Sequence, residues 1–321
     1  MKNTDTIYSQ TVDILVATYN GEKYIRAQLL SLLFQSHEAI RVLVHDDGST
    51  DATREIVREI AAKDSRVTLI EDGVRCGGAG KNFMHLLKFS TSDVVMFCDQ
   101  DDIWFDNKVS AMLEVLIKKD PAIPQVICSE AYVWNPNRGI DGTVLSSHPR
   151  HLNDLLFLNG GGIQGCATMF NKRMKEYLLR WKGNLWMHDH TLSLVGLTIG
   201  CVSYMPSILM LYRRHTGAVT GKLRMRTSPL SAFITNRRCP VVPLGVYDAV
   251  KKFWELYGDE LNQSDRAVVS AYLRMKEESV FYRLVEVLRY RFRIHDTLLG
   301  LILKIILRPY MKGIGPGGAF S

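Results

Sequence analysis

The sequence contains no apolar run long enough to span a membrane. The longest, LLGLILKIIL at 298–307, is about half of the roughly 20 residues that a transmembrane helix needs, and it includes Lys304. The first ten residues, MKNTDTIYSQ, are polar and have no apolar centre of the secretory-signal kind. We therefore expect a cytoplasmic protein that can still place an interfacial helix on a membrane.

Several nucleotide-binding and metal-binding motifs are also missing. None of the six cysteines forms a C-x-x-C pair, which indicates reduced thiols. TYNGE, and not the G-x-G-x-x-G of a Rossmann oxidoreductase, follows the first apolar segment. GGAGKN at 77–82 resembles a phosphate-binding loop, but Arg75 and Asn82 break the required pattern. Repeats and low-complexity tracts are absent as well.

The net charge of +7 is unevenly distributed along the chain. Residues 213–238 hold seven basic residues and no acidic one, and residues 281–321 hold seven basic and two acidic ones, so the remainder is net acidic. A basic C-terminal third indicates contact with a diphosphate or an anionic membrane surface, unless it is only a solvated face. Without interleaved aromatic and basic residues before the C-terminal helices, we expect no nucleic-acid partner.

Short β-branched runs alternate with amphipathic segments in the first part of the chain. We expect strands at 12–18, 40–45, 66–72, 93–99 and 125–132, and strand pieces within 197–212. Expected helices cover about 22–35, 52–63, 82–90, 109–119 and 171–181, and the chain turns helical again from about 245. This alternation predicts an α/β fold with a mostly parallel central sheet flanked by helices and with a helical C-terminal extension.

Three of the expected strands end in polar clusters: TYNGE, DDGSTD and DQDD. The carboxyl ends of parallel strands meet at one edge of the sheet, where ligands bind. Unpaired carboxylates in DQDD would repel one another, and a divalent cation that bridges to a diphosphate removes this repulsion. A polar turn that caps the next helix is the alternative.

At this point a resemblance becomes specific. ATYNGE at 17–22, DDGSTD at 46–51, GKNF at 80–83 and CDQDDIW at 98–104 follow the order and spacing of the family 2 glycosyltransferases. These are inverting enzymes of the GT-A fold, and the D-Q-D-D-I-W variant resembles their bacterial rhamnosyltransferase-like branch. The match covers about residues 12–220 and implies Mg²⁺ or Mn²⁺ as cofactor.

The resemblance implies roles for individual residues at the donor site. Ala17 and Tyr19 match positions that hold the nucleotide base, and Asp47 matches the carboxylate that reads a uracil or thymine imide. Asp99 and Asp101 match the D-x-D motif, whose first aspartate reaches the ribose and whose second ligates the metal. The other donor-binding positions that we predict in this half are Glu22 and Lys81.

Two later segments complete the predicted site. NLWMHDHTLSL at 184–194 places Asp189 where the family has its general base, which removes the proton of the attacking acceptor hydroxyl. Its two flanking histidines could instead indicate zinc, but no third ligand lies at suitable spacing. YRRHTGAVTG at 212–221 resembles the family's flexible basic loop. It supplies His215 as a further metal ligand, and Arg213 and Arg214 as donor-binding residues. We predict acceptor contacts at Gln164, Trp186 and His190.

The predicted catalytic domain covers residues 1–225, with a nucleotide-sugar half at about 1–110 and an acceptor half at about 111–225. Residues 226–321 form a helical C-terminal region. Within it, FYRLVEVLRYRFRI at 281–294 has an apolar stripe opposite several arginines, which either packs on the core or binds a membrane surface. The expected stripe consists of Phe281, Leu284, Val285, Leu288 and Phe292.

The resemblance implies a transferase that acts in cell-surface polysaccharide synthesis, such as that of O-antigen, at the inner face of the cell membrane. It favours dTDP-L-rhamnose as donor, with a UDP-sugar as the other possibility, and a saccharide acceptor that is lipid-linked. A catalytically inactive protein that only binds sugar nucleotides is an alternative, and a Rossmann-type oxidoreductase is a more distant one.

Overall fold

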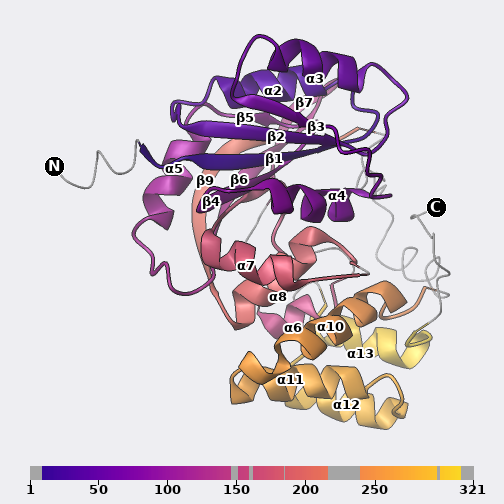
Figure 1. Cartoon of the computed structure of the whole chain (residues 1–321). Helices are drawn as coiled ribbons and strands as arrows, with labels where there is room; N and C mark the ends of the chain where they lie inside the picture. Colours follow the sequence, from indigo (N-terminus) through magenta and orange to yellow (C-terminus); the bar gives the residue numbers. More distant parts are fainter. Residues whose placement is uncertain are drawn as a thin grey trace.

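A computed structural model describes residues 9–145, 151–158, 162–183, 185–215, 239–294 and 297–311. Its centre is a sheet with strand order β3-β2-β1-β4-β8-β6-β9-β5, with β7 paired to β6. Helices cover both faces of this sheet (Figure 1). The predicted fold class, a mostly parallel sheet between helices with a helical C-terminal end, is confirmed.

Four parallel strands form the N-terminal side of the sheet, and all four match predicted strands. Their inner positions are apolar and β-branched, which suits strands that are covered on both faces. The strands are β1 (Val12–Thr18), β2 (Ile40–Asp46), β3 (Val67–Ile70) and β4 (Val94–Asp99).

The other side of the sheet mixes directions. β8 is antiparallel to both β4 and β6, β9 is parallel to β6, and β5 and β7 are antiparallel to their neighbours. The strands β5, β7 and β8 were not predicted from the sequence. These strands are β5 (Ile103–Trp104), β6 (Gln125–Asn135), β7 (Gly139–Leu145), β8 (Thr168–Asn171) and β9 (Cys201–Arg213).

Two apolar cores lie on opposite faces of the sheet. One is formed with α2 (Ile25–Leu33), α3 (Thr53–Ala61) and α5 (Lys108–Leu116). The other is formed with α4 (Ala79–Leu86), α7 (Lys172–Arg180) and α8 (His188–Thr198), which lie below the sheet in Figure 1. The described part of the chain also contains four short helical elements: α6 (Leu152–Leu155) and the 3₁₀ turns Leu87–Phe89, Gly165–Ala167 and Gly258–Glu260.

The C-terminal helices form a further layer against α8 (Figure 1). Val246, Val250 and Phe253 belong to the same core as Leu192 and Leu194 of α8. The region is helical, as predicted, but the predicted boundary at 225/226 lies outside the described residues. The helices are α10 (Leu244–Tyr257), α11 (Gln263–Arg274), α12 (Val280–Arg289) and α13 (Leu298–Leu307). Within the described ranges, none of the helices is both long enough and apolar enough to cross a bilayer.

One part of the predicted apolar stripe is wrong. Phe281, Val285 and Leu288 are exposed on α12, whereas Phe292 is fully buried. The helix ends at Arg289, and Arg291 adopts a positive φ of 51°, which turns the chain. The Phe292 ring therefore leaves the stripe and packs against the ring of Phe157, with the ring centres 5.2 Å apart.

Candidate active site

The polar ends of β1, β2 and β4 lie side by side, as the sequence analysis predicted. In the register of the parallel strands, Ala17 is paired with His45 on one side and with Asp99 on the other. Gln100 joins the first and last of these strand ends, because its amide accepts from the Tyr19 N–H at 2.9 Å and donates to the Tyr19 carbonyl at 3.0 Å. The Tyr19 side chain is 56% exposed beside this edge.

The two aspartates at the end of β2 have different surroundings. Asp46 accepts hydrogen bonds from the N–H groups of Gly48 and Ser49 and pairs with Arg54, so it stabilises the turn itself. Gly48 adopts a φ of 91°, which favours glycine. Asp47 instead points across to the segment before α4.

The Asp47 carboxylate accepts from three consecutive backbone N–H groups. They belong to Cys76, Gly77 at 3.2 Å and Gly78 at 2.9 Å. A base imide would have to share or replace these donors, so the predicted role of Asp47 in base binding stays a prediction. Glu22 has a comparable local function, because it accepts from the Ala52 N–H at 3.0 Å, just before α3.

Three acidic residues, Asp99, Asp101 and Asp102, gather at the end of β4. Burial and the nearby Asp101 carboxylate raise the pKa of Asp99 to about 7. Asp102 is fully buried. Its burial, and to a smaller extent the charge of Asp99, raise its pKa well above the usual range. One Asp102 oxygen accepts from the Arg213 N–H at 3.0 Å, and the other has no hydrogen-bond partner among the described residues.

A buried lysine lies beneath this acidic cluster. Lys108 has no exposed surface, donates to the Cys166 carbonyl at 2.6 Å and lies 3.7 Å from the centre of the Trp104 ring. Burial lowers its pKa to about 8, although Asp99 and Asp102 are close enough to act in the opposite direction. The cluster is therefore only partly compensated by positive charge.

The structure brings the two predicted metal ligands into contact. His215 Nε2 lies 2.6 Å from Asp101 Oδ2, and the His215 ring packs against Tyr24, with ring centres 4.6 Å apart. Arg213 donates to the Asp101 carbonyl at 2.5 Å and stacks on the ring of Trp134. Arg213 is 7% exposed, so its main contact is with the acidic loop itself.

These donors fit a divalent cation. Carboxylates are hard oxygen ligands, and a bound cation favours the ionised state that burial opposes at Asp99 and Asp102. The unpartnered oxygen of Asp102 and the exposed side of the Asp101–His215 pair offer ligand atoms. The ligand atoms of Asp99, Asp102 and Cys166 also lie within 4.8 Å of one another.

Asp189 opens α8 close to this cluster. It is 9% exposed, its Oδ1 accepts no hydrogen bond from the described residues, and burial raises its pKa to about 6. Its charge contributes to the raised pKa of Asp99, which places the two carboxylates in one electrostatic environment.

The histidines on either side of Asp189 are buried and neutral. Burial lowers the pKa of His188 to about 3 and that of His190 to about 4. His188 packs between the rings of Phe83 and Phe97, with ring centres 4.2 and 4.8 Å away. Neither histidine belongs to a potential metal cluster among the described residues.

The remaining predicted residues surround the same edge less closely. Lys81 is exposed on the first turn of α4, and Arg214 is exposed after β9. Gln164 is half-buried just before the turn that contains Cys166, and Trp186 packs over Gly245 at the start of α10. His190 has no exposed surface, which weighs against direct contact with an acceptor. The acceptor roles stay predictions.

The sequence analysis missed Gln100, Asp102 and Lys108. Asp102 follows the D-x-D pair directly, so its position in DQDD was the available signal. Lys108 carried a signal as well, because it precedes the inner-face residue Met112 by four positions and should share its side of the helix. Nothing in the sequence indicated that Gln100 would join two strand ends.

Comparison with known proteins identifies the family of this chain. The family model described as Glycosyl transferase family 2 matches residues 13–178, more than half of the chain. The chain therefore belongs to glycosyl transferase family 2.

Individual relatives cover different shares of the chain. The dTDP-rhamnosyl transferase RfbG of Shigella flexneri is 29% identical over 218 residues, which are 64% of this chain and 73% of that protein. The Escherichia coli UDP-Glc:alpha-D-GlcNAc-diphosphoundecaprenol beta-1,3-glucosyltransferase WfgD is 35% identical over 109 residues, 34% of this chain and 42% of that protein. This chain thus spans less than half of WfgD.

A solved structure supports the fold. Residues 1–349 of S. aureus TarS, in complex with UDP-GlcNAc, align with a TM-score of 0.55 and 17% identity over 82% of this chain and 71% of that chain. The predicted GT-A fold is thereby confirmed.

Proposed function

We propose that this protein transfers a sugar, with inversion, from a nucleoside diphosphate donor to an acceptor hydroxyl during synthesis of a cell-surface polysaccharide. The observation that carries the proposal is the acidic cluster of Asp99, Asp101 and Asp102 at the strand ends, with the buried carboxylate of Asp189 beside it. The three clustered aspartates suit a cation-bound diphosphate, and Asp189 suits the role of a base.

Asp189 is the proposed general base. Inverting transfer needs one group that accepts the acceptor proton while the oxygen attacks the anomeric carbon opposite the leaving diphosphate. A pKa of about 6 leaves the carboxylate largely ionised at neutral pH but more basic than an exposed aspartate. Its unpartnered Oδ1 is available to receive this proton.

Asp101 and His215 are the proposed ligands of Mn²⁺ or Mg²⁺, and the imidazole favours Mn²⁺. A bound divalent cation would neutralise the diphosphate charge that develops as the donor breaks. Arg213 holds the Asp101–Asp102 loop in place through its backbone N–H and its guanidinium. Lys81 and Arg214 are the exposed cations proposed to face the donor phosphates.

The donor is proposed to be dTDP-L-rhamnose. The name of RfbG, a dTDP-rhamnosyl transferase, supports a dTDP-linked sugar, and the match to RfbG covers more of this chain than the match to WfgD does. The name of WfgD and the ligand of TarS keep a UDP-sugar as the second candidate. The name of WfgD also supports a lipid-linked saccharide as acceptor.

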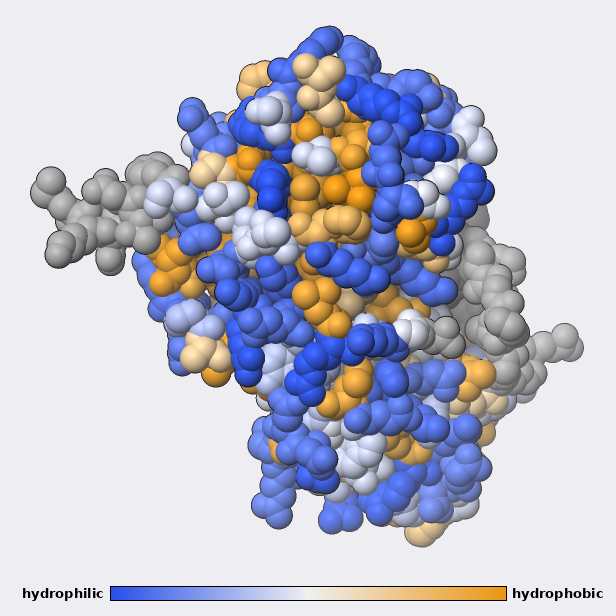
Figure 2. All heavy atoms as spheres, in the orientation of Figure 1, coloured by the Kyte–Doolittle hydropathy of each residue, from blue (hydrophilic) through white to orange (hydrophobic). Residues whose placement is uncertain are grey.

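The C-terminal helices support a position at the membrane surface. Exposed apolar side chains lie at helical spacing on α12 and on α13, and these two helices pack together. Apolar surface reaches the lower right edge of the view in Figure 2, over these helices. Exposed apolar residues on two neighbouring helices that also carry Arg289 and Lys304 suit an interfacial helix pair. Its largest exposed members are Phe281 (77%), Leu288 (57%), Leu299 (67%) and Ile306 (52%).

Calorimetric titration with dTDP, UDP and GDP, each with and without Mn²⁺, tests the proposal. We expect dTDP to bind most tightly and only in the presence of the metal. Preferential binding of UDP would change the donor but keep the mechanism. If no nucleoside diphosphate shows metal-dependent binding, the acidic cluster is not a donor site and the proposed function is wrong.

A further inference from the structure

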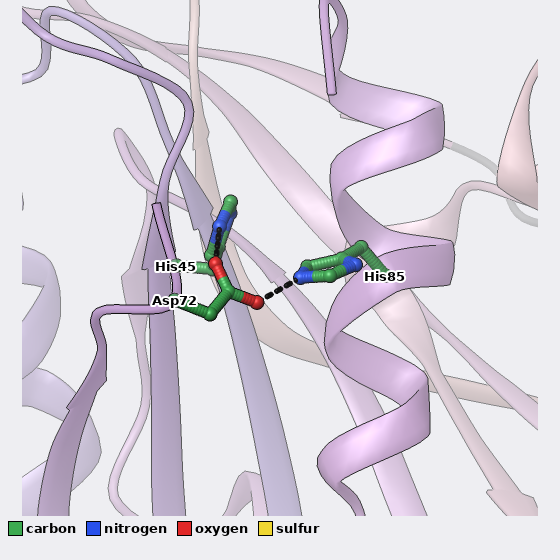
Figure 3. A group of neighbouring side chains, drawn as sticks. All are labelled: His45, Asp72 and His85. Carbon is green, nitrogen blue, oxygen red and sulfur yellow. Dashed lines mark hydrogen bonds and ion pairs between the residues drawn. The ribbon is translucent and has the colours of Figure 1, made fainter. Parts of the chain in front are cut away.

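A second group of potential metal ligands lies outside the acidic cluster and has no role in the proposed transfer. His45 comes from the end of β2, Asp72 follows β3, and His85 lies on α4 (Figure 3). Their ligand atoms all lie within 4.8 Å of one another. The Asp72 carboxylate lies between the imidazoles, with Oδ1 at 3.4 Å from His45 Nε2 and Oδ2 at 2.6 Å from His85 Nε2.

Asn82 fixes the orientation of the buried His45 ring and the proton on its Nδ1 atom. Its amide nitrogen donates to the His45 carbonyl at 3.1 Å, so its oxygen is the atom that faces His45 Nδ1 at 2.7 Å. His45 Nδ1 must therefore carry a proton and donate it. In the neutral ring the lone pair of Nε2 then faces the Asp72 oxygen, which is repulsive unless a cation lies between them.

We propose that His45, Asp72 and His85 bind one Zn²⁺ ion. Ligands at about 2.0–2.2 Å from a tetrahedral ion lie roughly 3.3–3.5 Å apart, which agrees with the 3.4 Å between His45 Nε2 and Asp72 Oδ1. The hydrogen bond between Asp72 and His85 would break when the ion binds between them, and water would complete the coordination. An Nδ1–H held by an oxygen, as in His45, is the usual support of a metal-binding imidazole.

The ligand types and their exposure distinguish this site from the donor site. Two imidazoles and one carboxylate select Zn²⁺ over Mg²⁺ and Mn²⁺, which prefer oxygen ligands. His45 is buried, whereas the side chains of Asp72 and His85 are 26% and 13% exposed, so the ion has a path from solvent.

The bound ion would stabilise the segment between β3 and α4. Asp72 Oδ1 already accepts from the Val74 N–H at 3.0 Å at the start of this segment, and Asp47 holds its end at Cys76 to Gly78. His85 lies on the helix that follows. Zn²⁺ would therefore hold β2, this segment and α4 together next to the strand ends that carry the proposed donor site. It would be a structural ion that takes no part in the transfer.

Zinc binding to the full-length protein tests this proposal without any activity assay. Purified protein would be titrated with Zn²⁺ against a chromophoric chelator, and its melting temperature would be measured with and without Zn²⁺. The variants are His85→Ala and Asp72→Asn, with His151→Ala as a control in which an exposed histidine outside the cluster is removed. All proteins keep the same cysteines, so zinc bound by thiols cancels in the comparison.

We expect wild type and His151→Ala to bind one tight equivalent of Zn²⁺ and to gain several degrees in melting temperature, because a ligand that binds the folded state stabilises it. His85→Ala and Asp72→Asn should each lose at least tenfold in affinity, while Asp101→Ala should keep the Zn²⁺ that is bound by His45, Asp72 and His85. Equal binding by all variants, or no tight binding by wild type, would overturn the proposal. Neither result would affect the donor site.

Discussion

At the residue scale, burial explains why one carboxylate of this protein, the proposed base, is more basic than an exposed aspartate. Asp189 lies at the start of α8 with one oxygen unpartnered among the described residues, and its pKa is raised to about 6 because little water reaches it. Asp99 is raised further, to about 7, because Asp101 adds its charge to the effect of burial. A bound cation would lower the pKa of Asp99 far more than that of Asp189.

The pH dependence of transfer should report this shift. Asp189 must be ionised to accept a proton, so kcat/KM should fall tenfold per pH unit below about pH 6. The measurement is the initial rate between pH 4.5 and 8.5 at fixed metal concentration. An activity that stays constant down to pH 4.5 would show that the base is another group.

Replacing Asp189 should change activity and stability in opposite directions. A raised folded-state pKa means that ionisation opposes folding, so Asp189 destabilises the protein above pH 6 and not at pH 4, where it is protonated in the folded state. Asp189→Asn should therefore stabilise the protein at pH 8 by up to about 3 kcal/mol and have little effect at pH 4. Urea unfolding at both pH values measures this difference, and an equal effect at both would contradict it.

Asp101 should control the metal dependence of donor binding. Asp101→Ala removes one carboxylate from the Asp101–His215 pair, so the Mn²⁺-dependent part of dTDP affinity should fall at least tenfold, about 1.4 kcal/mol. Asp106→Ala is the matched control, because that aspartate is exposed and lies nearby in the chain, between β5 and α5. An unchanged response of Asp101→Ala to Mn²⁺ would remove this residue from the metal site.

At the element scale, the start of α8 depends on the turn beside it. A Cβ atom at Gly165 would lie 2.4 Å from His188 Nε2, and the rings of Phe83 and Phe97 prevent the imidazole from moving away. Gly165→Ala should destabilise the protein by about 1–3 kcal/mol and lower kcat, because the clash displaces the helix that carries Asp189.

A double variant shows whether that clash is the cause. His188→Ala creates space for the added methyl group, so Gly165→Ala should cost less in the His188→Ala background than in wild type. Denaturant unfolding of the four proteins gives the coupling free energy. If the two effects simply add, Gly165 acts in some other way.

Elements were predicted well from the sequence where an apolar, β-branched run was followed directly by turn residues. The runs that became β1, β2 and β4 were apolar, β-branched and followed by turn residues, so both the strands and their convergence could be predicted. β7 and β8 gave no such signal. β8 holds only Thr168–Asn171, too short for a period to be read, and its place between β4 and β6 depends on long-range pairing.

Within the site, the sequence predicted which residues gather but not how they are bonded. Asp101 and His215 are 114 positions apart and nevertheless meet, as the family resemblance implied. The backbone donors that occupy Asp47 could not be foreseen, because they arise from the fold of residues 76–78 in space. The burial of His190 likewise depends on α8 being covered on all sides.

At the scale of the whole molecule, the C-terminal helices have one buried side and one exposed apolar side. Phe292, Leu301 and Ile305 belong to the core that reaches α8, so the region is part of the folded unit. The other faces of the same helices expose apolar side chains that nothing in the described chain covers. Truncation would expose the core, so surface substitutions are the sharper test of membrane binding.

Replacing three exposed apolar residues should release the protein from membranes. Phe281→Ser, Leu288→Ser and Leu299→Ser together should reduce binding to anionic liposomes at least tenfold, because each buried side chain contributes roughly 1.5–3 kcal/mol. Thermal unfolding should change little. Phe34→Ser, which alters a 75% exposed residue at the end of α2, is the control, and loss of binding in that variant would show that the attraction is unspecific.

The most direct test of the proposed mechanism compares donor binding with transfer in Asp189→Asn. Calorimetry should show that this variant binds dTDP with Mn²⁺ as tightly as wild type. Transfer of a labelled sugar to a lipid-linked acceptor should fall by at least a thousandfold, because only the base is lost. If the variant loses nucleotide binding as well, Asp189 is structural; if it still transfers sugar at the wild-type rate, the assignment of the base at the start of α8 is wrong.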